Sequence, residues 1–362
     1  MKKGYLVLEN GQIFEGMRFG AFAEEGCGEN HECIGELVFT TGVVGYIETL
    51  TDPSYYGQIV MQTFPQIGNY GVIPEDFEGK SALFGYVIKE LCEAPSNFRS
   101  EMTLDEYLKK IGVPGLCGVD TRELTRIIRE NGTMNAVICD QVPDNLDAVR
   151  AYSVKDAVKN VIQEKQKEYK AEAPVYRVAL IDYGAKHNII RELCRRGCDV
   201  TVYPATVQAE EILAGRFDRV MLSNGPGDPA ENLYAIGQIR ELLGRLPVFG
   251  ICLGHQLLAL ANGGKTDKLK YGHRGANQPV TQVGGKRTYI TTQNHGYTVL
   301  AESLEGIGRQ SFINANDGTC EGMEYPGKMA FSVQFHPEAC AGPHDTSFLF
   351  DRFIMLMEEH HA

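Results

Sequence analysis

Residues 247–261 read PVFGICLGHQLLALA: an apolar run, a cysteine among glycines, and a second apolar run. The first run has the character of a short buried strand and the second that of a helix, so the sequence predicts a sharp strand-to-helix turn at Cys252. Gly250 and Gly254 are needed there because the backbone of such a turn leaves no room for Cβ atoms. This layout is typical of a nucleophile elbow, with sulfur in place of oxygen.

The position of Cys252 makes it the candidate nucleophile. Unpaired N–H groups and the positive end of the helix dipole favour a thiolate at a helix N-terminus. The other nine of the ten cysteines are scattered, mostly through apolar segments. We expect these nine to be reduced packing residues, since a chain of this size needs no disulfide framework.

Length and charge restrict the classes of function. The chain has 362 residues and a formal charge of −12, and its length is sufficient for two domains. Because nucleic acids and anionic membranes bind basic surfaces, the charge argues against both as partners. We find no apolar run near the ~18 residues of a membrane span, and no signal-peptide core. We therefore expect a cytoplasmic protein that acts on a small molecule.

The composition of the sequence and the pattern of its apolar runs change near residue 153. Residues 1–152 contain short strand-like runs punctuated by glycine, which predict a strand-rich α/β domain. Residues 153–175 are rich in lysine and glutamate and predict a polar helix or tether. In residues 176–362, apolar runs alternate with helical segments, which indicates a mostly parallel sheet with helices on both faces. The active site of such a sheet lies beyond the carboxyl ends of its strands. The expected strands are 178–182, 199–203, 219–223 and 248–249.

A glycine-proline turn follows the third of these strands. Residues 223–229 read SNGPGDP, which cannot continue as strand or helix. In isolation, this segment would be read as a simple tight turn. Because it leaves the sheet at the same end as the elbow, Gly225 or Gly227 can donate one N–H group to an oxyanion, and Leu253 can donate the other.

The best candidate for the general base is His336. It follows the apolar run 330–335, and residues two apart in extended backbone point the same way, so Glu338 can lie beside the imidazole. The carboxylate would fix the tautomer and support the imidazolium. Two other histidines compete: His255 inside the elbow helix, where packing is the simpler interpretation, and His295 on a glycine loop without a nearby acid.

These features together indicate acyl transfer through a thioester. Cys252 would attack an amide carbonyl, and His336 would protonate the departing amine and then activate water. The glycine-turn N–H groups would stabilise the oxyanion. The chemistry alone does not identify the amide.

Several motifs carry a family resemblance. The elbow, the 223–229 turn, QNHGY at 293–297 and the His336–Glu338 pair resemble, in order, the class I (triad-type) glutamine amidotransferase domain, over residues 176–362. The amino-terminal half adds matching segments, namely 45–46, LTDPSY at 50–55, PQIGN at 65–69 and GVDTR at 118–122. The whole chain thus resembles the family of small, glutamine-hydrolysing subunits of carbamoyl-phosphate synthetase.

The resemblance implies a set of functional residues. Cys252, His336 and Glu338 would form the catalytic triad. Seven residues would surround L-glutamine: Gly225, Gly227, Leu253, Gln256, Asn294, Gly296 and Tyr297. Gly42 departs from the family pattern, since bacterial relatives often carry a serine there that reaches the glutamine.

The resemblance also implies a partner. Ammonia released from glutamine would pass to a large synthetase subunit, which forms carbamoyl phosphate for pyrimidine and arginine synthesis. We expect no cofactor on this chain, and ATP and magnesium on the large subunit. The one phosphate-loop look-alike, GGKT at 263–266, ends a helix instead of opening one, and Ala259 stands where the pattern requires glycine.

No metal site is expected. Residues 336–344 hold a histidine, a cysteine and a histidine at ligand-like spacing, but prolines break any helix that would align them.

Two alternative functions remain from the sequence. A free-standing class I amidotransferase serving another synthetase would have no need of the first domain. A non-catalytic docking subunit would commonly have lost one of Cys252, His336 and Glu338.

Overall fold

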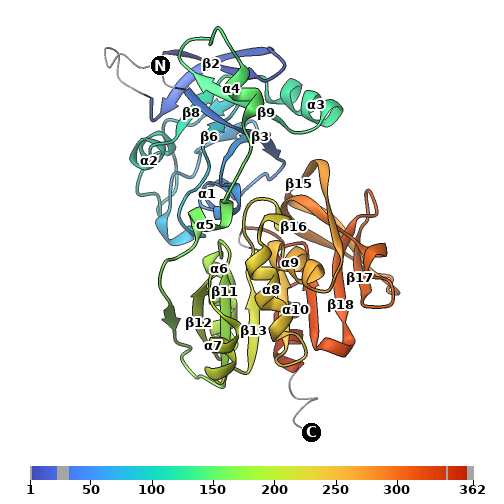
Figure 1. Cartoon of the computed structure of the whole chain (residues 1–362). Coiled ribbons are helices and arrows are strands. Elements are labelled where there is room, and N and C mark those ends of the chain that lie inside the picture. The colour runs from blue at the N-terminus through green and yellow to red at the C-terminus, as the bar shows by residue number, and fades with distance from the viewer. Residues whose placement is uncertain (1, 23–31, 340, 357–362) are drawn as a thin grey trace. The chain divides into compact units, whose positions relative to one another are not determined.

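The structure, a computed structural model, describes residues 2–22, 32–339 and 341–356. The chain divides into two compact units, Met1–Lys155 and Asp156–Ala362, each with its own sheet (Figure 1). Eight described cysteines are free thiols, namely Cys252 and seven of the nine that were expected to be reduced packing residues; Cys27 and Cys340 lie outside the described residues. Within the described ranges, no helix has both the length and the apolar character needed to cross a bilayer.

The first unit is a closed barrel of seven strands. In spatial order these are β1 (Lys3–Leu8), β2 (Ile13–Gly20), β8 (Pro114–Cys117), β6 (Gly85–Val87), β4 (Gln58–Gln62), β3 (Glu32–Thr40) and β9 (Met134–Cys139). Two short strands, β5 (Gln66–Ile67) and β7 (Glu90–Leu91), pair separately. The helices of the unit are α1 (Tyr46–Leu50), α2 (Leu104–Ile111), α3 (Thr121–Asn131) and α4 (Asp147–Ala151). Helix α3 begins after Asp120, whose carboxylate accepts a hydrogen bond from the Glu123 N–H.

The second unit contains a ten-stranded sheet. Its strands lie in the order β10 (Lys167–Tyr169), β12 (Cys198–Pro204), β11 (Tyr176–Asp182), β13 (Arg219–Leu222), β14 (Val248–Ile251), β19 (Ala330–Val333), β18 (Cys320–Tyr325), β16 (Thr288–Leu300), β15 (Lys265–Gln282) and β17 (Arg309–Asn314). The five strands from β12 to β19 run parallel, which confirms the α/β class. The others pair antiparallel and extend the sheet beyond the part that the sequence predicted.

Helices cover both faces of the parallel strands, as predicted (Figure 1). On β11, Val178 and Leu180 pack with α6 (His187–Arg195) and α10 (Phe348–Met355). The alternate residues Ala179 and Ile181 pack on the opposite face with three other helices, α7 (Ala209–Ala214), α8 (Leu233–Leu242) and α9 (Leu253–Ala261). Alternation along a strand buried on both faces thus accounts for the continuous apolar runs.

The segment 153–175, for which a polar helix or tether was expected, contains the short helix α5 (Ala157–Val161) and the strand β10. Strand β10 pairs with β12 at one edge of the sheet. Charged side chains suit an edge strand because they discourage pairing with another chain. The same charges made the segment read as a linker.

The elbow between β14 and α9 is as tight as its glycines predict. A Cβ atom on Gly250 would lie 2.6 Å from the Gly254 carbonyl oxygen, and one on Gly254 would lie 2.4 Å from the Leu222 carbonyl oxygen. Both obstacles are backbone atoms, which cannot rotate away. Cys252 itself has φ 54° and ψ −103°, a region that residues with side chains rarely adopt.

This packing predicts the effect of one methyl group. Gly254→Ala should lower the free energy of unfolding by about 1–3 kcal/mol, because α9 must move off β13. Gly237→Ala is the matched control, since Gly237 lies inside α8 with open space around its Cβ position. The control should be neutral or stabilising by up to about 1 kcal/mol. Urea unfolding of both variants measures the difference, and equal stabilities would contradict the packing argument.

Candidate active site

Cys252 lies at the carboxyl end of β14, between β13 and β19, as the fold class predicts for an active site. Its N–H group donates to the carbonyl of Val333 on β19, and its buried thiol faces the carbonyl of Asn294 on β16, 3.6 Å away. The nucleophile candidate is therefore held by two strands besides its own.

The structure places Glu338 beside His336. Nδ1 of His336 lies 2.6 Å from Oε1 of Glu338, and both side chains are buried. Among the described residues, Nε2 of His336 has no hydrogen-bond partner, so this atom remains available for proton transfer. The N–H group of His336 donates to the Thr292 carbonyl of β16, which holds the segment that follows β19 against β16.

His336 and Glu338 are both charged in spite of their burial. Burial and the nearby Lys186 lower the pKa of His336, but Glu338 and the Cys252 thiol outweigh them and raise it to about 9. Burial favours a neutral Glu338, yet His336 and Lys186 hold the pKa of this carboxyl below its usual value. An imidazolium and a carboxylate are thus the stable forms in this environment.

The 223–229 turn packs directly against the elbow. A Cβ atom on Gly225 would lie 2.2 Å from the Tyr183 carbonyl oxygen and 2.8 Å from Cδ2 of Leu253. Gly227 has φ +86°, which a residue with a side chain would adopt only under strain. Gly225 is therefore required by the close approach of the turn to the elbow, and Gly227 by its own backbone conformation.

Asn294, Gly296 and Tyr297 lie on β16, and Gln256 on α9 binds the last of these. Both amide hydrogens of Gln256 are used, since Nε2 donates to the Tyr297 carbonyl at 2.8 Å and to Oε1 of Gln334 at 3.0 Å. Gln256 therefore ties α9 to the segment of β16 that runs past Cys252.

Sequence reasoning missed three polar residues near the pair. Nζ of Lys186 lies 3.8 Å from Oε1 of Glu338, and Nδ2 of Asn188 donates to the Glu338 carbonyl. Asn224 accepts from the Lys186 N–H at 3.0 Å. Lys186 and Asn188 follow β11 and Asn224 follows β13, so the rule that sites lie at the carboxyl ends of parallel strands could have found them.

The two competing histidines have other environments. His255 packs in the core, with Nδ1 2.8 Å from Oγ of Ser332, and burial lowers its pKa to about 3. His295 lies in β16, and its Nε2 is 3.8 Å from Oε1 of Glu321. The expectation of a loop without a nearby acid was wrong for His295, because pairing of distant strands brings Glu321 there.

Three further segments bear on cofactors and substrate. The GGKT segment joins the end of α9 to β15, the order opposite to that of a phosphate loop. Gly42 lies in the first unit, between β3 and α1. Of the residues 336–344, whose spacing resembles that of metal ligands, position 340 lies outside the described chain.

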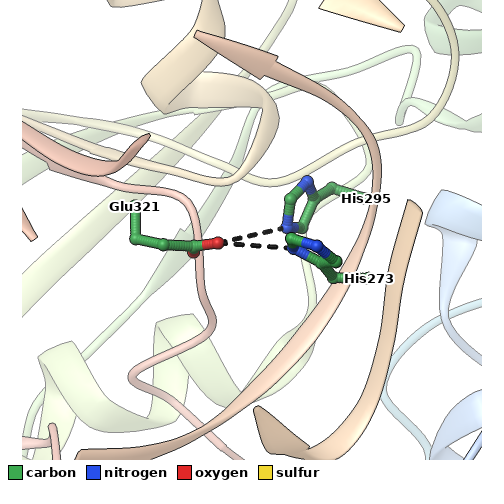
Figure 2. Close-up of side chains that lie close together, drawn as sticks. All are labelled: His273, His295 and Glu321. Atoms are coloured by element: carbon green, nitrogen blue, oxygen red, sulfur yellow. Dashed lines mark ion pairs between the residues drawn. The ribbon is translucent and has the colours of Figure 1, made fainter. Parts of the chain in front are cut away.

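Among the described residues, one group has metal-like spacing, namely His273, His295 and Glu321 (Figure 2).

Comparison with known proteins gives matches over both units. The family model "Glutamine amidotransferase class-I" matches residues 179–356, and "Carbamoyl-phosphate synthase small chain, CPSase domain" matches residues 6–138.

Full-length relatives are also similar to the chain. A carbamoyl phosphate synthase small chain of Clostridium perfringens is 49% identical, with 97% of this chain and 99% of the relative covered. Small chains of Bacillus caldolyticus (49% identical, 99% and 97% covered) and Syntrophotalea carbinolica (48% identical, 99% and 98% covered) are similar over the same extent.

The raised pKa of His336 predicts a pH dependence of stability. A histidine whose pKa is higher in the folded chain adds stability that is complete below 6.5 and is lost as the pH rises through about 9. The free energy of unfolding should therefore fall over this interval. Glu338→Gln should remove most of the fall, because the carboxylate holds the proton on the ring. Urea unfolding at both ends of the interval tests this, and an equal fall in the variant would refute it.

Proposed function

The chain belongs to the family of carbamoyl-phosphate synthase small chains, and on that premise we propose that Cys252, His336 and Glu338 hydrolyse L-glutamine to L-glutamate and ammonia. The observation that carries the proposal is the buried His336–Glu338 pair next to a cysteine held in an elbow at the ends of adjacent parallel strands. An acyl-transfer enzyme requires this combination of nucleophile, base and orienting carboxylate.

The first half-reaction forms a thioester. The Cys252 sulfur attacks the side-chain amide carbon of glutamine while the proton that the sulfur has given up is held on Nε2 of His336, whose raised pKa favours the imidazolium. The carbonyl oxygen becomes an oxyanion, which the N–H group of Leu253 and that of Gly225 or Gly227 stabilise. When the tetrahedral intermediate collapses, His336 returns the proton to the leaving nitrogen, and ammonia departs.

The second half-reaction restores the enzyme. His336 removes a proton from water, whose oxygen attacks the thioester carbon at the same oxyanion position. Collapse of this intermediate breaks the carbon–sulfur bond and releases L-glutamate, and the proton taken from water stays on His336, as at the start of the cycle. Throughout, Glu338 keeps the imidazole in one orientation and stabilises its charged form.

The remaining residues would bind the amino-acid end of glutamine. Since both amide hydrogens of Gln256 are already bonded, only its carbonyl oxygen is left to accept from the substrate ammonium group. Asn294, Gly296 and Tyr297 would supply the adjacent wall from β16. Gly42 offers no hydroxyl, so our proposal includes no side-chain contact from that position.

The partner in this proposal is the large subunit of carbamoyl-phosphate synthetase. Ammonia is a substrate for the synthesis of carbamoyl phosphate, and ATP and magnesium would be bound by that subunit. The complex would act in the cytoplasm, for which the eight free thiols are suited.

The nucleophile assignment predicts a selective loss. In complex with the large subunit, Cys252→Ser should lower glutamine-dependent synthesis of carbamoyl phosphate by roughly a thousandfold or more, while synthesis from added ammonia continues. Cys198→Ser, at a buried cysteine of β12, is the control and should retain glutamine-dependent synthesis. Retention of that activity by Cys252→Ser would overturn the assignment.

The partner assignment predicts association. The purified chain and the large subunit should elute together in gel filtration, and mixing them should raise the rate of glutamate release from glutamine. Separate elution at micromolar concentrations, with an unchanged rate of glutamate release, would contradict the proposed complex.

A further inference from the structure

A buried cluster of polar side chains lies beside the segment of β16 that passes Cys252. Its centre is Glu321 on β18, which faces the rings of His273 on β15 and His295 on β16 (Figure 2). Oε1 of Glu321 lies 3.4 Å from Nδ1 of His273 and 3.8 Å from Nε2 of His295. The mechanism described above uses none of the three side chains.

The spacing suits a metal ion, but the surrounding donors argue against one. Nδ2 of Asn314 lies 3.4 Å from Nδ1 of His273 and 3.3 Å from Oε1 of Glu321, so its hydrogens occupy the space between the ligand atoms. The orientation of this amide is fixed because its oxygen accepts from the Asn316 N–H. A cation would have to displace these hydrogens, and we infer that the cluster is a hydrogen-bond network.

His273 lies between two acidic side chains. Its Nε2 lies 2.8 Å from Oδ2 of Asp317, on the side opposite Glu321. Burial lowers the pKa of His273, but Glu321 and Asp317 raise it above the ordinary value. Burial raises the pKa of Glu321, and the neighbouring His273 opposes that rise.

The network holds alternate residues of β16 on one face of the strand. Oε2 of Glu321 accepts from Nε2 of Gln293 at 3.0 Å, and the same nitrogen lies 3.2 Å from Oγ1 of Thr291. Oε1 of Gln293 lies 3.2 Å from Nε2 of His295, whose Nδ1 faces the Tyr297 carbonyl at 2.8 Å. Glu321 thus fixes, directly or through Gln293, four positions between residues 291 and 297.

The same segment of β16 carries the backbone acceptors of the active site. The Thr292 carbonyl accepts a hydrogen bond from the His336 N–H group. The Asn294 carbonyl accepts one from the Cys252 thiol, and the Tyr297 carbonyl accepts one from Nε2 of Gln256. A small displacement of this segment would move all three contacts and the proposed wall of the glutamine pocket. Displacements of about 1 Å can change catalytic efficiency by about a hundredfold.

We propose that Glu321 and His273 are positioning residues that hold β16 in register for glutamine binding. This inference rests on the proposed function, because it assumes that Asn294, Gly296 and Tyr297 contact the substrate. Neither positioning residue touches the reacting atoms. Their effect is transmitted through Gln293 and the β16 backbone.

The test is Glu321→Gln, which preserves shape but places an amide N–H₂ group against the donors of Gln293 or Asn314. In the complete complex, kcat/KM for glutamine should fall by about tenfold or more, with a rise in KM that is larger than the fall in kcat. Glu324→Gln on the same strand is the matched control, since Glu324 pairs with Arg309 and Arg352 instead. The control should lose stability without a change in KM.

A second variant distinguishes an effect of the network from misfolding of a single variant. His273→Gln should raise KM in the same direction, and the double variant should be less impaired than the product of the single effects, because both act through one network. An unchanged KM in Glu321→Gln, or an equal rise in Glu324→Gln, would overturn the inference. A wild-type complex that does not hydrolyse glutamine would instead reject the proposed function.

Discussion

The contact between α9 and β13 at Gly254 is the constraint on which the active site depends. No Cβ atom fits between this glycine and the Leu222 carbonyl, and the Gly254 N–H donates to the Ser223 carbonyl at 3.0 Å. Because the helix begins against the backbone of the neighbouring strand, Cys252 must accept a conformation that side chains rarely adopt. The glycine turn that follows β13 is thereby brought against the elbow.

A second principle is the burial of charge in compensated sets. Glu338 lies between His336 and Lys186, and Glu321 lies beside His273. An isolated charge at such depth would be costly, so each acidic side chain lies against a basic one. In the first set the basic ring belongs to the proposed base. In the second set the hydrogen bonds of the acidic side chain stabilise the strand beside it.

The sequence predicted the features that are encoded locally. The elbow glycines, the spacing of His336 and Glu338, the parallel strands and their covering helices all follow from patterns within about ten residues. The antiparallel half of the second sheet was not foreseen. The acid near His295 was missed because Glu321 is brought there by strands that are not consecutive along the chain. Strand β10 was not foreseen because an exposed edge strand has the composition of a linker.

The contact between the Cys252 thiol and the Asn294 carbonyl has a consequence for the idle enzyme. This contact and the burial of the side chain, which is 2% exposed, keep solvent away from the sulfur. Oxidation of a cysteine by peroxides depends on access to the sulfur. The geometry therefore limits oxidation of the proposed nucleophile during periods without glutamine.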